Sequence, residues 1–286
     1  MQRFALEIYP CAYVSMTVLC EKFGQLLYIF LFLLLPLQTI ANPKISIITS
    51  LYKGEKFIKG FLQDITRQTI FDQCELIIIN ANSPEHEEPI IREYMKKYPN
   101  IIYKKLDYQL GLYATWNMGI NMARGIYITN ANVDDRLSAK CYAVHARFLD
   151  ANPSIDLVYS NSFITTLVND KFEKNLQKHP RVQLPFSPNN IKKSCMPSFN
   201  PMWRKSMHDK HGLFDESFII AGDWEMWIRA VKLGSVFKKI NGFYGLFYNN
   251  HEGLSTATTN NKLRLTEETR MKKLHADFFS SRKNKQ

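Results

Sequence analysis

The sequence predicts an α/β fold in which a mostly parallel sheet carries helices on both faces. Short apolar, β-branched runs alternate with longer segments in which apolar residues recur every three or four positions. This alternation is typical of βαβ units, whose strands join one parallel sheet. The expected strands span residues 45–49, 75–79, 101–103 and 125–129, and the helices between them span 55–69, 84–97 and 112–124.

Local features of the sequence explain why these segments are expected to form strands and helices. The first strand, residues 45–49, carries no charge, as expected for a central parallel strand that is buried on both faces. In the first helix, Phe57 and Phe61 are four positions apart and share one face. The second helix begins with acidic residues and ends with Lys96 and Lys97, which suits the helix dipole.

The second half of the chain continues the pattern less regularly. We expect helices over 137–152, 222–234 and 262–279, strands over 156–159 and 242–248, and a polar loop over 169–190. Gly234 is expected to end the helix before it. The prediction is a single domain over residues 43–286, divided into a ligand-binding half, 43–166, and a second half, 167–286, that ends in a basic helix.

The first 42 residues are expected to be an apolar leader and not part of the fold. Residues 26–37 form an uncharged apolar run, which is shorter than the roughly 20 residues that a membrane span needs. The run fits the core of a signal peptide. A signal anchor, a core helix and a start at Met16 are the alternatives. The leader predicts a membrane-associated or secretory location, or one at the cytoplasmic face if the segment is not exported.

Charge and cysteine content narrow the classes of partner. The formal net charge is +11, which indicates nucleic acid, an anionic membrane surface or phosphate-bearing ligands. No known nucleic-acid motif occurs, so we expect phosphate ligands, a possible membrane surface and no nucleic acid. The five cysteines show no CxxC pair and no metal-binding spacing, which argues against a disulfide framework.

The strongest functional signal follows the fourth strand. The apolar run ends abruptly in Asn132, Asp134, Asp135 and Arg136. Two adjacent carboxylates after a buried strand repel each other unless a cation neutralises them. Asn132 and Asp134 point the same way on an extended backbone, and their hard oxygens suit Mg²⁺ or Mn²⁺ bound to a phosphate. In isolation the motif also fits a solvated turn.

The loops after the other strands support the functional interpretation, because ligands of open α/β sheets bind at the carboxyl ends of the strands. Together these segments resemble a family 2 glycosyltransferase with the GT-A fold, over about residues 44–255. Matching features include Gln68, the Gly-rich spacing over 111–125, the segment 222–229, and Asn132 to Asp135 at the position of the family's DxD motif. The resemblance makes 43–166 the nucleotide-sugar half and 167–286 the acceptor half.

The resemblance implies a role for particular residues. The expected nucleotide-sugar-binding residues are Thr49, Ser50, Tyr52, Asn80, Asn82, Asn117, Asn132 and Asp134. The expected metal ligands are Asp134, Asp135 and His251, holding Mn²⁺ or Mg²⁺. Asp223 is the expected base, with Glu225 as the fallback, in an inverting transfer to an acceptor hydroxyl. The acceptor is expected to be a glycan, a lipid-linked molecule or a protein.

Two departures from the family pattern keep alternatives open. Asn80 and Asn132 stand where relatives carry acids, which puts nucleotide identity and metal affinity in doubt. The chain could therefore be a non-catalytic relative that binds a nucleotide or glycan. A nucleotidyltransferase is a further alternative, although the first loop offers only one Gly and one Lys. No GxGxxG follows the first strand, which disfavours a dinucleotide oxidoreductase.

Overall fold

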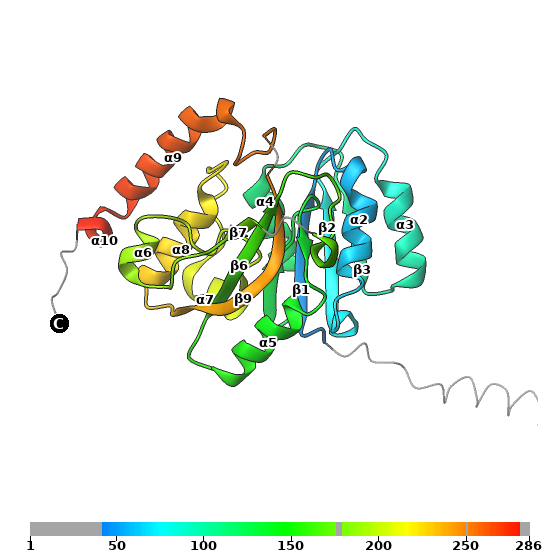
Figure 1. The fold of residues 1–286 in the computed structure, drawn as a ribbon. Helices are drawn as coiled ribbons and strands as arrows, with labels where there is room; N and C mark the ends of the chain where they lie inside the picture. The colour runs from blue at the N-terminus through cyan, green and yellow to red at the C-terminus, as the bar shows by residue number, and fades with distance from the viewer. Residues whose placement is uncertain (1–41, 176–178, 250, 281–286) are drawn as a thin grey trace, which may run out of the picture. The chain divides into compact units, whose positions relative to one another are not determined.

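The computed structural model describes residues 42–175, 179–249 and 251–280, and these form a mixed sheet between two helical layers (Figure 1). The strand order is β3-β2-β1-β4-β8-β6-β9-β5, with β7 paired to β6. The strands are β1 (Ile45–Leu51), β2 (Cys74–Asn80), β3 (Ile101–Lys105), β4 (Tyr127–Asn130), β5 (Arg136–Leu137), β6 (Leu157–Thr165), β7 (His179–Arg181), β8 (Met202–Arg204) and β9 (Phe237–Tyr248).

Helices cover both faces of this sheet. They are α2 (Glu55–Ile65), α3 (Glu88–Lys97), α4 (Leu112–Met122), α5 (Cys141–Ala151), α6 (Pro188–Ile191), α7 (Ser206–His211), α8 (Gly222–Lys232), α9 (Asn261–Leu274) and α10 (Ala276–Ser280). One core joins the sheet to α2, α3 and α5, and the other joins it to α4, α7 and α8. Alternate side chains of β1 and β2 enter the two cores, so both strands are buried on each face.

The predicted α/β fold is confirmed, and its first four strands run parallel as expected. β1 lies between β2 and β4, and β3 extends the sheet beyond β2. Gly119 allows α4 to pack closely on β1, since a Cβ there would lie 2.5 Å from a methyl carbon of Ile48. This half of the molecule follows directly from the periodicity of the sequence.

The second half departs from the expected elements in several places. β8 is antiparallel to both β4 and β6, and it was not predicted because its three residues form a strand only through those pairings. The expected loop over 169–190 contains β7 and the start of α6. The expected helix over 137–152 begins only at Cys141, because Arg136 and Leu137 pair with β9 instead. The terminal helix divides at His275 into α9 and α10.

The predicted membrane-associated or secretory location needs correction. Within the described parts of the chain, no helix is both long enough and apolar enough to pass through a membrane. The apolar run over 26–37, on which the prediction rested, lies outside the described residues. The proposed division of residues 43–286 at position 166 stays a prediction.

Candidate active site

The loops after β1, β2 and β4 meet at one edge of the sheet. Leu51 lies opposite Asn80, so β1 and β2 end at the same level, and β4 ends opposite Ile48, three residues earlier along β1. Within the first of these segments, Thr49 is fully buried and Ser50 is half-buried, whereas Tyr52 is 40% exposed. Tyr52 is therefore the member of this segment that is most available to a ligand.

The loop after β2 is held by a buried hydrogen-bond network. The side-chain oxygen of Asn80 accepts the Ser83 N–H at 2.7 Å, and its amide donates to the Tyr103 hydroxyl at 3.1 Å. The Ser83 hydroxyl donates to Glu87 at 2.6 Å, and the same Glu87 oxygen accepts the Gly54 N–H at 2.8 Å. Asn80 thus shapes the loop, in which Asn82 is exposed at a φ of 60° and donates its side-chain amide to the Asp107 carbonyl at 3.3 Å.

Glu87 is a member of this site that the sequence did not single out. It is fully buried, and its second carboxylate oxygen has no hydrogen-bond partner among the described residues. It ties the start of α2 to the loop after β2 through Gly54. In the sequence, Glu87 is one of several acidic residues at the start of a helix, where acids are usually exposed. Nothing in the sequence therefore distinguishes it as buried.

The loop after β4 places two carboxyl groups in different environments. Asp134 is half-buried and accepts no hydrogen bond from another described residue. Asp135 is buried, and its oxygens accept the Asn132 side-chain amide and the Tyr248 N–H, both at 3.0 Å. Burial, and then the neighbouring charge of Asp134, raise the pKa of Asp135 to about 8. Burial also raises the pKa of Asp134.

This carboxylate pair fits a divalent cation. Each acid resists ionisation in a low-dielectric setting beside the other, and a cation would relieve that repulsion. Magnesium often uses only one or two protein carboxylates together with substrate phosphates, and Asp134 is available for that role. The described residues contain no group of three or more His, Cys, Asp or Glu side chains arranged for a metal. The expected third ligand, His251, lies in an exposed loop and does not complete such a group.

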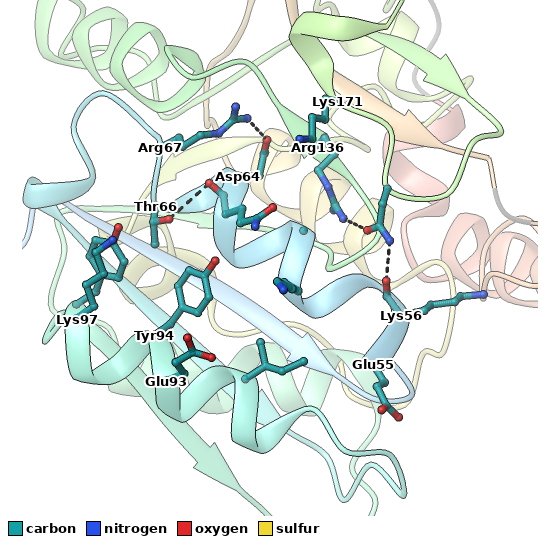
Figure 2. A pocket seen from close by; sticks show the side chains of 16 residues that line it. Glu55, Lys56, Asp64, Thr66, Arg67, Glu93, Tyr94, Lys97, Arg136 and Lys171 are labelled. Carbon is teal, nitrogen blue, oxygen red and sulfur yellow. Dashed lines mark hydrogen bonds and ion pairs between the residues drawn. The ribbon is translucent and has the colours of Figure 1, made fainter.

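Behind this loop, the buried side chain of Arg136 reaches α2. Its guanidinium donates to the Val133 and Phe57 carbonyls and to the Asn169 side chain. Figure 2 shows it beside a groove of about 970 Å³ that lies along α2 and α3. The groove contains none of the predicted site residues, so its position does not mark the candidate active site. Arg136 holds the acidic loop in place from behind.

Asp223 lies at the start of α8 and is surrounded by three donors. The Trp224 N–H donates to its Oδ1 at 2.8 Å, the Tyr113 hydroxyl lies 3.4 Å from the same oxygen, and the Cys195 thiol lies 3.5 Å from Oδ2. Burial raises the pKa of Asp223, and these hydrogen bonds partly oppose the rise. A raised pKa makes a carboxylate a stronger base, which suits it to accept a proton.

Asp223 lies at the same sheet edge as the loops after β1, β2 and β4. Tyr113 is in the first turn of α4, which follows β3, so this turn lies at the carboxyl end of the parallel strands. Gly222 permits the close contact, because a Cβ at this position would lie 2.6 Å from the Tyr113 ring. The Tyr113 hydroxyl donates to the Ile220 carbonyl at 2.7 Å and lies 3.4 Å from Asp223, and these contacts bring the start of α8 to the edge where the loop of Asp134 begins.

Two other predicted site residues have structural partners. Glu225 is buried, forms a paired salt bridge with Arg229 at 2.9 and 3.0 Å, and lies 3.1 Å from His275. Asn117 is also buried, and its amide makes three hydrogen bonds to Phe214 and Glu216. Asn117 therefore joins α4 to the loop before α8, and its side chain is fully engaged without a ligand.

The mixed sheet and the polar loops at its carboxyl edge define a GT-A-type transferase fold. The sequence profile described as glycosyl transferase family 2 matches residues 46–210, and the chain belongs to that family. An uncharacterized glycosyltransferase of Methanocaldococcus jannaschii, MJ1057, is 29% identical over 206 residues, which are 71% of this chain and 69% of that protein.

Solved structures share the fold at low sequence identity. A crystal structure of S. aureus TarS in complex with UDP aligns with a TM-score of 0.63 at 18% identity, over 80% of this chain and 64% of that one. The mannosyltransferase PcManGT of Pyrobaculum calidifontis, in complex with GDP-Man and Mn²⁺, aligns with a TM-score of 0.57 at 15% identity. That alignment covers 84% of this chain and 69% of the mannosyltransferase.

Proposed function

We propose that this protein transfers a hexose from a nucleotide-sugar to an acceptor hydroxyl, with inversion of the anomeric configuration. The proposed donor is a UDP-sugar. The observation that carries the proposal is the position of Asp223. It is a half-buried carboxylate with a raised pKa, held by Tyr113 and Cys195 at the edge where the nucleotide loops end. Family membership supports the reaction class, and the UDP bound to TarS supports the donor.

Asp223 is the group that would remove the acceptor proton. A hydroxyl must lose its proton as it attacks the anomeric carbon, and a carboxylate within hydrogen-bond reach can take it. A single displacement of this kind inverts the anomeric centre. Trp224 and Trp227 follow Asp223 in α8, but both are buried in the core. We therefore assign them to packing behind the base and not to direct contact with a sugar.

The donor is proposed to lie along the loops after β1, β2 and β4. Tyr52 and Asn82 are exposed there, and Asn132 lies beside the acidic pair. Asp134, with Asp135 behind it, would hold the Mn²⁺ or Mg²⁺ that the family commonly uses. When bound, such a cation supplies positive charge that stabilises the departing diphosphate. The Mn²⁺ in PcManGT supports this choice of cofactor.

A panel of sugar nucleotides tests the proposal. Purified protein is incubated with UDP-, GDP-, ADP- and CMP-linked sugars, and release of the free nucleotide is measured with MnCl₂, with MgCl₂ and with EDTA. We expect release from at least one donor that depends on added metal. No release from any donor under any of these conditions, with or without candidate acceptors, would count against the transferase.

The second candidate is a non-catalytic nucleotide- or glycan-binding protein. The hydrogen bond from the Asn132 amide to Asp135 favours it, because an amide replaces an acid that would strengthen metal binding. Calorimetry with UDP, with and without Mn²⁺, separates the two candidates. Metal-dependent binding without nucleotide release would support the binding protein. A nucleotidyltransferase remains a third alternative, and release of pyrophosphate instead of a nucleoside diphosphate would identify it.

A further inference from the structure

Arg181, at the end of β7, is a cation without an assigned role. One guanidinium nitrogen, Nη2, donates to the Ser198 hydroxyl at 2.9 Å, and the guanidinium lies 4.6 Å from the centre of the Phe247 ring. The other terminal nitrogen, Nη1, is buried and has no hydrogen-bond partner among the described residues. Arg181 as a whole is only half-buried. Ser198 and Phe247 thus hold the guanidinium on two sides, and Nη1 is left without a hydrogen-bond acceptor among the described residues.

Strand pairing and one aromatic contact relate Arg181 to the acidic loop. Arg181 lies opposite Ser162 of β6, and Ser162 lies opposite Gly245 of β9. Gly245 in turn pairs with Leu137, two residues beyond Asp135. This path keeps to one sheet face but crosses three strands. A shorter link runs through Phe247, whose ring centre lies 4.6 Å from the Arg181 guanidinium and which precedes Tyr248, whose N–H donates to Asp135 at 3.0 Å.

On its other side, Arg181 approaches the proposed base. The Cys195 thiol lies 3.5 Å from Asp223 and donates to its carboxylate. Ser198, the hydrogen-bond partner of Arg181, lies only three residues beyond Cys195. Arg181 therefore stands between the proposed cation ligands and the proposed base.

An anion is the expected ligand of a guanidinium nitrogen that lacks an acceptor in this position. Desolvating a charged donor is costly unless an acceptor replaces the lost water. The hydrogen bonds that the Asp135 and Asp223 carboxylates accept come from other donors, and neither carboxylate is hydrogen-bonded to Arg181. The planar guanidinium suits the oxygens of a phosphate, to which it can donate two parallel hydrogen bonds.

We propose that Arg181 binds a phosphate group on the acceptor and so selects phosphate-bearing acceptors. This inference rests on the proposed transferase function. The acceptor is favoured over the donor because Arg181 and Ser198 belong to the segments that adjoin Asp223, where the attacking hydroxyl must lie. The diphosphate of the donor is the other source of the same chemistry, and the experiment below separates the two.

The test is calorimetric and does not require turnover. Arg181→Gln and Arg181→Lys are compared with the wild type, using sn-glycerol 3-phosphate as the acceptor probe and inorganic pyrophosphate with MnCl₂ as the donor probe. Arg147→Gln is the matched control, because it removes one positive charge from an exposed position on α5. Melting temperatures establish that each variant is folded.

We expect Arg181→Gln to weaken glycerol 3-phosphate binding by roughly tenfold or more, and Arg181→Lys to weaken it less. Pyrophosphate binding should stay within about twofold of the wild type, and Arg147→Gln should change neither. Loss of pyrophosphate binding alone would overturn the acceptor assignment. Unchanged binding of both probes, or no binding of glycerol 3-phosphate by the wild type, would overturn the proposal. Nucleotide-sugar turnover by the wild type reports separately on the transferase function.

Discussion

The carboxylate of Glu267 in α9 accepts the backbone N–H of Ala221 at 2.9 Å, two residues before the proposed base. The same carboxylate accepts the N–H groups of Ile219 and Ile220 at 2.7 and 2.8 Å. The Ile220 carbonyl in turn accepts the Tyr113 hydroxyl at 2.7 Å. The terminal helix, which lies beyond the family match at residues 46–210, thus fixes the loop that presents Asp223.

Replacing Glu267 with Gln should therefore affect both stability and catalysis. The substitution leaves buried N–H groups facing an amide, which we expect to cost about 2 kcal/mol and to lower kcat roughly tenfold through misplacement of Asp223. The KM for the donor should change little. Glu268→Gln, one position along α9, is the control, because the Glu268 side chain has no hydrogen bond to another described residue. Equal effects in both variants, measured by melting and steady-state kinetics, would refute the positioning role.

Replacing Tyr113 with Phe should move the pH profile. The Tyr113 hydroxyl helps to lower a pKa of Asp223 that burial raises, so removing it should raise that pKa further. The base must be ionised to accept a proton, and the acidic limb of kcat/KM should shift to higher pH. The comparison is a pH–rate profile of the two proteins between about pH 5 and 9. A limb that stays in place or moves to lower pH would contradict the assigned interaction.

Replacing Glu225 with Gln should separate stability from chemistry. The change removes one side of a buried ion pair with Arg229, which we expect to cost about 3 kcal/mol. Turnover of the folded variant should remain within a few-fold of the wild type. Arg229→Gln breaks the same pair and should lower the melting temperature to a similar extent. If Glu225→Gln melts normally but loses at least a hundredfold in kcat, Glu225 and not Asp223 is the base.

His145 should make the protein sensitive to acid. It is fully buried in α5, neither ring nitrogen has a partner among the described residues, and burial lowers its pKa to about 4. Because the unfolded chain takes up a proton near pH 6.5 and the folded protein does not, stability falls as pH drops through this interval. The loss should reach roughly 3 kcal/mol near pH 4.

Urea unfolding at pH 7 and pH 4.5 measures this contribution. His145→Leu should lose less stability than the wild type over this interval, since the unfolded variant lacks the titrating group. His86→Leu, at an exposed position, should retain the wild-type dependence. An identical loss in the wild type and His145→Leu would show that other groups control the acid sensitivity.

The sequence predicted the parallel half of the fold well because each element there is specified locally. Strands such as β1 and β2 are uninterrupted apolar runs, and α2 has a regular apolar face. The loops that end these strands were therefore placed correctly at one edge of the sheet. β8 escaped prediction because three residues become a strand only when β4 and β6 lie on either side.

Individual roles at the site were harder to predict, because one residue type serves several purposes. Asn117 matched a ligand-binding position, yet its amide is fully used in holding Phe214 and Glu216. Glu267 and Arg181 gave no local signal, since their partners lie 46 and 17 residues away in the sequence. Such contacts depend on tertiary packing, which no periodic pattern encodes.

The most direct test of the transferase account is nucleotide release by Asp223→Asn with the best donor from the panel and its acceptor. Asparagine preserves the shape of the side chain but cannot accept the acceptor proton as a carboxylate does. We predict that kcat falls at least a thousandfold, while calorimetric affinity for the nucleotide and metal stays within a few-fold of the wild type. Turnover by a folded Asp223→Asn variant at a rate close to that of the wild type would contradict the account.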